Sequence, residues 1–378
     1  MRLGAFLTFA ALIVYSYVVY PTVLCILAAL FGRRGGADET YTPTVSVLIP
    51  AFNEEDVIAR KIENTLELDY PRDKLEVIVA SESSDGTDAI TRRYEKQGVR
   101  LLSSTVRRGK VANLNRAIPE SRGEILLLTD ATAMLRPNAM RKMVRHFADG
   151  RIGSVSGRLI YAKHSGTAAA VAEGIYWEME QILKWASSRL FSLPGATGSL
   201  FAVRRRCYRL LSADRGDDFE IAICCILDGH GAIQDPEAIS VEEATGSLLH
   251  VYRRKVRISN WMFRSALILL AEAIRRGRWL LALQLSHRIN RWAVPAWLIG
   301  LLASTLCLLD REPLFQVIAA AQVGLYTIAL SFFIIDRIVR PLKGWLGMPS
   351  YFLVVNAASL VGIITGLLGY KVTWYKTR

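Results

Sequence analysis

The chain begins with a long apolar run. Residues 3–32 contain no charged side chain, which is enough to cross a bilayer with some tilt. The run is too long for the apolar core of a signal peptide, and no small-residue cleavage site follows it. Arg33 and Arg34 come next, and such positive flanks stay on the cytoplasmic side of a membrane. The pattern predicts an N-terminal transmembrane helix over residues 1–34 that ends in the cytoplasm.

From residue 45 to about residue 160, short apolar runs alternate with helical patterns. The runs are typical of buried strands and lie at residues 45–49, 75–80, 99–102 and 124–129. Helical periodicity lies between them, near residues 54–68, 87–97 and 110–118. This alternation predicts an α/β domain with a mostly parallel sheet and helices on both faces. Ligands of such sheets bind beyond the carboxyl ends of the strands.

The last third of the chain is again apolar, with a basic stretch before it. Residues 251–290 interleave arginines with large apolar side chains, which predicts amphipathic helices in the membrane interface. Residues 292–309 and 313–335 carry no charge and are separated by Asp310-Arg311-Glu312. They predict a helical hairpin with that turn outside, because basic residues follow again at 337, 340 and 343.

Residues 344–370 are also uncharged and leave two interpretations open. A further span would place Lys371, Lys376 and Arg378 outside, against the positive-inside rule, whereas an interfacial or re-entrant helix would keep them inside. Several glycines and Pro349 make the segment irregular, and the interfacial interpretation is the one we favour.

These patterns divide the chain into five parts. They are a transmembrane helix (1–34), a cytosolic domain (41–250), amphipathic interfacial helices (251–290), a transmembrane hairpin (291–336), and a final interfacial or third or fourth membrane helix (337–378).

Composition supports this division. The 378 residues are 52% hydrophobic, which is too apolar for one ordinary soluble domain and too charged, at 21%, for a pure membrane bundle. The net charge of +13 gathers largely beside apolar segments, where it would face anionic lipid. Zinc-finger spacing and a basic, aromatic sheet pattern are both absent from the sequence, so we do not expect nucleic-acid binding. The five cysteines form no CxxC, which suits a reducing cytoplasm.

Polar residues follow each of the four predicted strands. Pro50-Ala51-Phe52-Asn53-Glu54-Glu55 follows the first and Ser81-Glu82-Ser83-Ser84-Asp85-Gly86-Thr87 the second. Arg107-Arg108-Gly109-Lys110 follows the third and Asp130-Ala131-Thr132 the fourth. Carboxylates, backbone turns and a lysine would thus meet in one crevice. A nucleotide diphosphate needs this mixture, since a lysine neutralises phosphate oxygens and a carboxylate can hold a bridging divalent cation.

Each of these pieces has a plainer explanation when taken alone. Ser-Asp-Gly-Thr is often a helix N-cap, and Arg-Gly-Lys is often a solvated turn. Their joint occurrence in this order carries the interpretation. A further pair, Asp217 and Asp218, lies in an apolar stretch between the α/β half and the membrane half. Such a pair can take a proton from a hydroxyl group.

Together these motifs resemble the membrane-bound family-2 inverting glycosyltransferases of the bacterial polysaccharide-synthase type, similar to hyaluronan and cellulose synthases. The resemblance implies a Rossmann-like glycosyltransferase A fold with a mostly parallel mixed sheet, plus transmembrane and interfacial helices. It places Pro50, Asn53 and Glu54 in the first nucleotide motif and Glu82 where the family has an Asp that contacts the base, with Asp85 sharing that contact.

The same resemblance gives roles to the other strand ends. Lys110 would meet the donor, and Asp130 would reach Mg²⁺ or Mn²⁺ and the diphosphate, with Thr132 in place of the second acid of a DxD motif. Gly195, Thr197 and Gly198 would form the acceptor-side loop. Asp218 would be the catalytic base, assisted by Asp217.

Two basic segments complete the resemblance. Arg254 and Arg257 stand where processive members have QxxRW, but the Gln and Trp are absent. Trp374 and Arg378 resemble the gating loop of hyaluronan-type synthases, or simply end the chain as a basic anchor.

The expected activity is transfer of a sugar from a nucleotide-diphosphate sugar to a glycan hydroxyl in cell-surface polysaccharide biosynthesis at the inner membrane. A UDP-sugar is the leading candidate for the donor. A polyprenyl phosphate or other lipid acceptor is the alternative. A receptor built on a degenerate transferase domain is a third interpretation.

Overall fold

The computed structural model describes residues 1–33, 35–162, 168–212, 215–243, 248–339 and 344–370. Its centre is an eight-stranded mixed sheet with the strand order β3-β2-β1-β4-β7-β6-β8-β5. The strands are β1 (Val45–Ala51), β2 (Leu75–Ser81), β3 (Val99–Ser103), β4 (Ile125–Leu128), β5 (Met134–Leu135), β6 (Ile152–Ala162), β7 (Phe201–Arg204) and β8 (Gly231–Glu243). The four predicted strands are confirmed as β1 to β4.

Four parallel strands form one half of this sheet. β1 pairs in parallel with both β2 and β4, and β2 pairs in parallel with β3. β7 is antiparallel to β4 and β6, β8 runs parallel to β6, and β5 is antiparallel to β8. The carboxyl ends of β3, β2, β1 and β4 therefore lie side by side, as the sequence predicts.

Helices cover both faces of the sheet. Alternate residues of β1 point to opposite faces of the sheet. On one face, Leu48 packs in the core with α5 (Lys110–Glu120) and α8 (Asp217–Leu227). Val47 and Ile49 join the core under α3 (Ile58–Leu66) and α6 (Ala139–Val144). α4 (Thr87–Arg92) follows β2. The predicted architecture, with a mostly parallel mixed sheet and apolar helices beside it, is confirmed.

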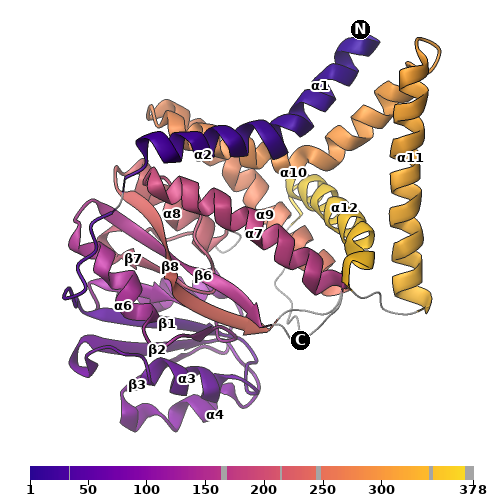
Figure 1. The fold of residues 1–378 in the computed structure, drawn as a ribbon. Helices are drawn as coiled ribbons and strands as arrows, with labels where there is room; N and C mark the ends of the chain where they lie inside the picture. Colours follow the sequence, from indigo (N-terminus) through magenta and orange to yellow (C-terminus); the bar gives the residue numbers. More distant parts are fainter. Residues whose placement is uncertain (34, 163–167, 213–214, 244–247, 340–343, 371–378) are drawn as a thin grey trace.

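The remaining long helices gather on one side of the sheet (Figure 1). They are α1 (Arg2–Val14), α2 (Tyr20–Phe31), α7 (Ala168–Arg189), α9 (Leu248–Arg275), α10 (Trp279–Leu306), α11 (Pro313–Ile334) and α12 (Met348–Leu367). Among the described residues, three stretches are long and apolar enough to cross a membrane, namely Arg2–Phe31, Pro313–Ile334 and Trp345–Leu367.

Two sequence boundaries fall differently in the structure. The division at residues 290 and 291 lies inside the continuous helix α10, which joins the basic segment to the first half of the expected hairpin. The segment 344–370, for which an interfacial position was favoured, contains the third stretch that could cross a membrane.

Helices α9 and α12 touch closely through glycine. A Cβ atom added to Gly362 of α12 would lie 2.5 Å from the Val256 carbonyl oxygen and 2.7 Å from the Ser259 Cβ. Asn260 Nδ2 donates to Thr365 Oγ1 over 3.0 Å beside this contact. The position of α9 therefore depends on a backbone-to-backbone contact that only glycine allows.

Gly362→Ala should separate α9 from α12 and lower thermal stability, because overpacking costs about 1–3 kcal/mol. Melting of the purified protein in a neutral detergent measures this. Gly324→Ala in α11 is the matched control, because nothing lies within 4 Å of its added Cβ. Equal melting temperatures for the two variants would contradict the close-contact argument.

Candidate active site

One lysine joins the end of the parallel sheet to helix α8. Lys110 begins α5, and its Nζ lies 2.8 Å from Asp130 Oδ1 and 3.2 Å from Asp217 Oδ2. The first contact is a hydrogen-bonded ion pair, whereas the Asp217 oxygen lacks hydrogen-bond geometry and interacts by charge alone. Burial alone would lower the pKa of Lys110, but Asp130, Asp217 and Asp218 outweigh it and raise that pKa above its ordinary value. The structure thus brings Asp130 and the Asp217–Asp218 pair to one place.

Asp218 lies beside the predicted acceptor loop. Its carbonyl oxygen accepts a 2.8 Å hydrogen bond from the Ala196 backbone N–H. A Cβ atom on Gly198 would come within 3.1 Å of Asp218 Oδ2, so the loop backbone lies against the carboxylate. Burial, and then the like charge of Asp217, raise the pKa of Asp218 to about 6, against the opposing effect of Lys110 and Lys184. A carboxylate with such a pKa is a competent proton acceptor near neutral pH.

The acceptor loop is held from three sides. Gly195 has a φ of +127°, a conformation that side chains disfavour. The Thr197 backbone N–H donates to Ser156 Oγ on β6 over 2.9 Å, and Thr197 Oγ1 accepts from Lys184 Nζ on α7 over 2.6 Å. The Arg288 guanidinium of α10 lies 3.6 Å from the Cβ position of Gly195.

Sequence reasoning missed Lys184 and Arg288. Lys184 is 5% exposed although it belongs to the long helix α7. The sequence shows Lys184 as a single lysine among largely apolar neighbours in a helical pattern. It does not show which face of the helix Lys184 occupies.

Hydrogen bonds join the loop after β1 to the loop after β2. Asn53 has a φ of +55°, and its Oδ1 accepts from the Ser84 backbone N–H over 2.8 Å. The Glu54 backbone N–H donates to Thr87 Oγ1 over 2.9 Å, and Asp85 Oδ1 accepts from the Thr87 backbone N–H over 3.0 Å. These contacts shape the loops in which the nucleotide is expected.

Glu82 and Pro50 support the same region. Glu82 Oε2 accepts from the backbone N–H groups of Arg108 and Gly109, over 3.0 and 2.9 Å. The acid at the expected base-contact position therefore fixes the turn that delivers Lys110. Pro50 lies in β1 opposite Ala80. The nucleotide roles of both residues stay predictions.

Of the four residues predicted in the two basic segments, two lie in α9 and two outside the described residues. Arg254 Nη1 donates to the Tyr161 hydroxyl over 3.3 Å. Burial and Arg254 lower the pKa of Arg257 to about 10, while Asp130, Asp218 and Asp217 act on it in the opposite direction. Arg257 is thus close enough to the carboxylates to interact with them by charge. Trp374 and Arg378 belong to the terminal residues that the structure does not describe.

The residues present fit a divalent cation that takes some of its ligands from the protein and the rest from a substrate. Among the described residues, no group of three or more His, Cys, Asp or Glu could hold a metal ion. Asp130 offers one carboxylate, 37% exposed, at the sheet edge. One or two carboxylates completed by phosphate oxygens is a common arrangement for Mg²⁺.

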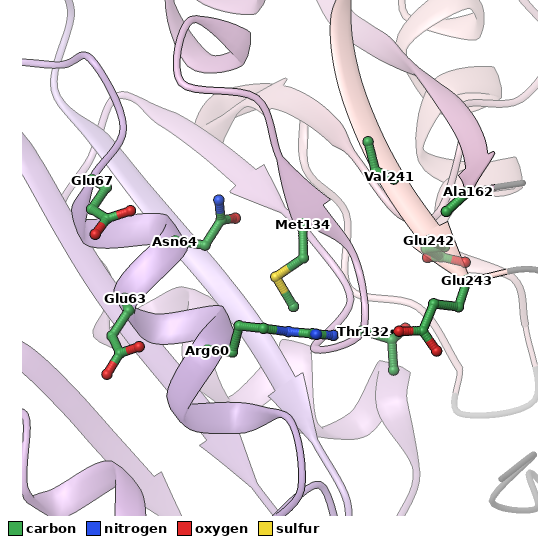
Figure 2. Close-up of a pocket in the computed structure, with 10 residues that line it drawn as sticks. All are labelled: Arg60, Glu63, Asn64, Glu67, Thr132, Met134, Ala162, Val241, Glu242 and Glu243. Carbon is green, nitrogen blue, oxygen red and sulfur yellow. Dashed lines mark ion pairs between the residues drawn. The ribbon is translucent and has the colours of Figure 1, made fainter. Parts of the chain in front are cut away.

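The carboxylates of this cluster do not line the cavity of about 410 Å³ that Figure 2 shows. It is lined by Arg60, Glu63, Asn64, Glu67, Thr132, Met134, Ala162, Val241, Glu242 and Glu243. Thr132, which stands in place of the second acid of the expected motif, lines this cavity. The geometry that resembles an active site is therefore the Lys110 cluster, not this cavity.

Comparison with known proteins finds related glycosyltransferases. Residues 46–211 match the family model "Glycosyl transferase family 2". A beta-monoglucosyldiacylglycerol synthase of Trichormus variabilis is 36% identical over 31% of this chain and 26% of its own length. An N-acetylglucosaminyltransferase of Bradyrhizobium diazoefficiens is 25% identical over 69% of this chain and 59% of its own length. The chain thus spans only part of the curated relatives it matches.

The whole fold has a counterpart among solved structures. The mannosyltransferase PcManGT from Pyrobaculum calidifontis, in complex with GDP-Man and Mn²⁺, superposes with a TM-score of 0.75 at 23% identity. The similarity covers 98% of this chain and 99% of that one, so it includes the long helices as well as the sheet and confirms the predicted glycosyltransferase A-like fold.

Lys110→Met should lower the melting temperature by several degrees at pH 8 and by less at pH 5. Lys110, with its raised pKa, is charged at both values, so the difference comes from the carboxylates left behind, which protonate as the pH falls. Thermal melts of wild type and variant at the two pH values measure it. Lys142→Met is the control, since Lys142 also bridges two carboxylates, Glu39 and Glu237, but these are more than half exposed. The same loss in both variants, or at both pH values, would contradict the account.

Proposed function

We propose that this chain is a membrane-bound, inverting, nucleotide-sugar-dependent hexosyltransferase. It moves a sugar from a nucleotide-diphosphate sugar to a hydroxyl of a glycan acceptor in cell-surface polysaccharide biosynthesis. A UDP-sugar is the leading candidate for the donor. The observation that carries this proposal is Lys110 between Asp130 and Asp217, with Asp218 adjacent. The match to the family 2 model over residues 46–211 supports it.

The reaction is a single displacement at the anomeric carbon. The acceptor O–H bond breaks and its proton passes to Asp218, while the acceptor oxygen forms a bond to the anomeric carbon on the face opposite the leaving group. The bond from that carbon to the diphosphate oxygen breaks, and its electron pair leaves with the nucleotide diphosphate. A positioned base of this kind contributes about 10²–10⁴-fold.

Positive groups on the donor side would stabilise the departing diphosphate. Lys110 lies at the sheet edge, and Arg257 interacts by charge with the same carboxylates. When bound at Asp130, Mg²⁺ or Mn²⁺ supplies Lewis-acid stabilisation of the phosphate oxygens. Fixed charges placed where negative charge develops usually contribute more to such catalysis than proton transfer does.

A lipid acceptor, including a polyprenyl phosphate, is the second candidate. The acceptor loop is held by Lys184 of α7 and lies against Arg288 of α10, two of the long helices that gather on one side of the sheet. A relative of similar sequence is named for a diacylglycerol product. The location that goes with either acceptor is the inner membrane, multi-pass, with the sheet domain in the cytoplasm and the apolar spans anchoring it.

Asp218→Asn should abolish sugar transfer by at least about a hundredfold and leave nucleotide binding near normal, because only the proton acceptor is lost. Transfer from labelled UDP- and GDP-sugars, with and without lipid, measures activity, and calorimetry measures nucleotide affinity. Asp228→Asn at the other end of α8 is the matched control. Full turnover by Asp218→Asn refutes the base assignment.

The pH profile gives the same role a second test. Because Asp218 must be ionised to accept a proton and its pKa is raised to about 6, kcat/KM should fall about tenfold per pH unit below that value. A profile that stays flat down to pH 5 would contradict the assignment.

Asp130→Ala should remove most of the metal-dependent nucleotide affinity while leaving the weaker metal-free binding, since its carboxylate would hold the cation. Titration of UDP and GDP with and without Mn²⁺ measures both affinities. A metal effect of wild-type size in the variant would count against the role of Asp130.

A further inference from the structure

Helix α3 contributes a lysine to the interior of the protein. Lys61 has 0% exposure and is a large side chain fully enclosed by the core. Its Nζ donates to Thr129 Oγ1 over 2.9 Å and to the Ala133 carbonyl oxygen. Burying an ammonium group is costly, so a lysine kept there calls for a physical reason.

The two acceptors bracket the turn that carries Asp130. Thr129 immediately precedes Asp130, and Ala133 closes the turn through its backbone N–H, which donates to the Asp130 carbonyl oxygen over 3.1 Å. Lys61 therefore fixes both ends of this turn from below. Because both acceptors are uncharged oxygens, the ammonium does not neutralise the Asp130 carboxylate through a direct hydrogen bond.

The same contact reaches the acceptor side. Thr129 Oγ1, which accepts from Lys61, donates to the Ser199 carbonyl oxygen over 2.8 Å. Ser199 follows Gly198, whose Cβ position lies against Asp218. A chain of hydrogen bonds thus runs from Lys61 through Thr129 to the loop beside Asp218.

Charge ties Lys61 to the same region. Burial lowers the pKa of Lys61 to about 7, and Asp130 and then Glu242 act against that decrease through space. The Lys61 ammonium group therefore interacts electrostatically with the Asp130 carboxylate, which belongs to the turn that Lys61 fixes.

We propose that Lys61 is a positioning residue for the divalent-cation site, because it fixes the Asp130 turn and links that turn through Thr129 to the loop that frames Asp218. This rests on the proposed function, in which Asp130 holds the cation. Outer groups that hydrogen-bond around a metal ligand typically change metal affinity by about 10–100-fold when removed. Here the effect would act through the backbone of the turn instead of through the ligand's own oxygens.

The test is Lys61→Met in the full chain, with Mn²⁺ affinity measured by electron paramagnetic resonance in the presence of UDP or GDP. Mn²⁺ affinity should fall by about 10–100-fold, while metal-free nucleotide affinity stays near wild type. Lys74→Met is the matched control, since Lys74 also donates to a carbonyl and a hydroxyl oxygen, both of Thr42, over 2.8 and 2.9 Å. Equal Mn²⁺ affinity in the two variants would overturn the proposal.

Thr129→Val provides the second arm, because it keeps the lysine and removes the hydroxyl that accepts from Lys61 and donates to Ser199. It should weaken Mn²⁺ binding several-fold, and the double variant should bind Mn²⁺ no more weakly than Lys61→Met alone. If Lys61→Met does not fold, Thr129→Val decides, and wild-type Mn²⁺ affinity in that variant overturns the proposal.

The Asp130→Ala variant separates the failure of this inference from the failure of the proposed function. If Asp130→Ala leaves Mn²⁺ binding intact, both the proposed function and this inference fail. If Asp130→Ala abolishes binding while the Lys61 and Thr129 variants are silent, only this inference fails.

Discussion

The site depends on one ammonium group that keeps carboxylates from distant parts of the chain together. Asp130 follows a central strand and Asp217 begins a helix much later in the chain, yet both lie within 3.2 Å of Lys110 Nζ. Negative groups this close repel one another strongly where water is scarce. Lys110 offsets that repulsion, and Glu82 fixes the turn before it through two backbone hydrogen bonds. The loop that carries Asp130 and helix α8 are thereby joined through the Lys110 ammonium group.

Neighbouring carboxylates on α8 have different surroundings. Asp217 faces Lys110 and is 5% exposed, whereas Asp218 faces the backbone of the acceptor loop and has a raised pKa. Two adjacent acids in different environments can have different chemical roles. The pair in the sequence does not show these surroundings, which the fold determines.

Local pattern was sufficient for much of the sheet domain. The first four strands and the helices between them follow from the alternation of apolar runs and helical periodicity, and their parallel order places Lys110 and Asp130 at one edge. Lys61 and Lys184 could not be recognised, because a lysine in a helical pattern is normally exposed and only tertiary packing shows that these two are enclosed. The length of α10 was missed for a related reason. The change from basic to apolar composition near residue 290 suggested two segments, but composition does not stop a helix, and α10 continues through it.

Packing of the long helices bears on the Lys110 cluster through α9. Arg257 interacts by charge with Asp130, Asp217 and Asp218, and it lies one residue after Val256, whose carbonyl oxygen faces Gly362. A displacement of α12 would therefore move the guanidinium relative to the carboxylates, since packed helices have little free volume to absorb a shift. The helix that approaches α9 here belongs to a stretch apolar enough to cross a membrane. Packing of this apolar stretch and charge balance at the sheet edge are thus physically connected, so removal of the apolar helices would disturb the geometry around Lys110.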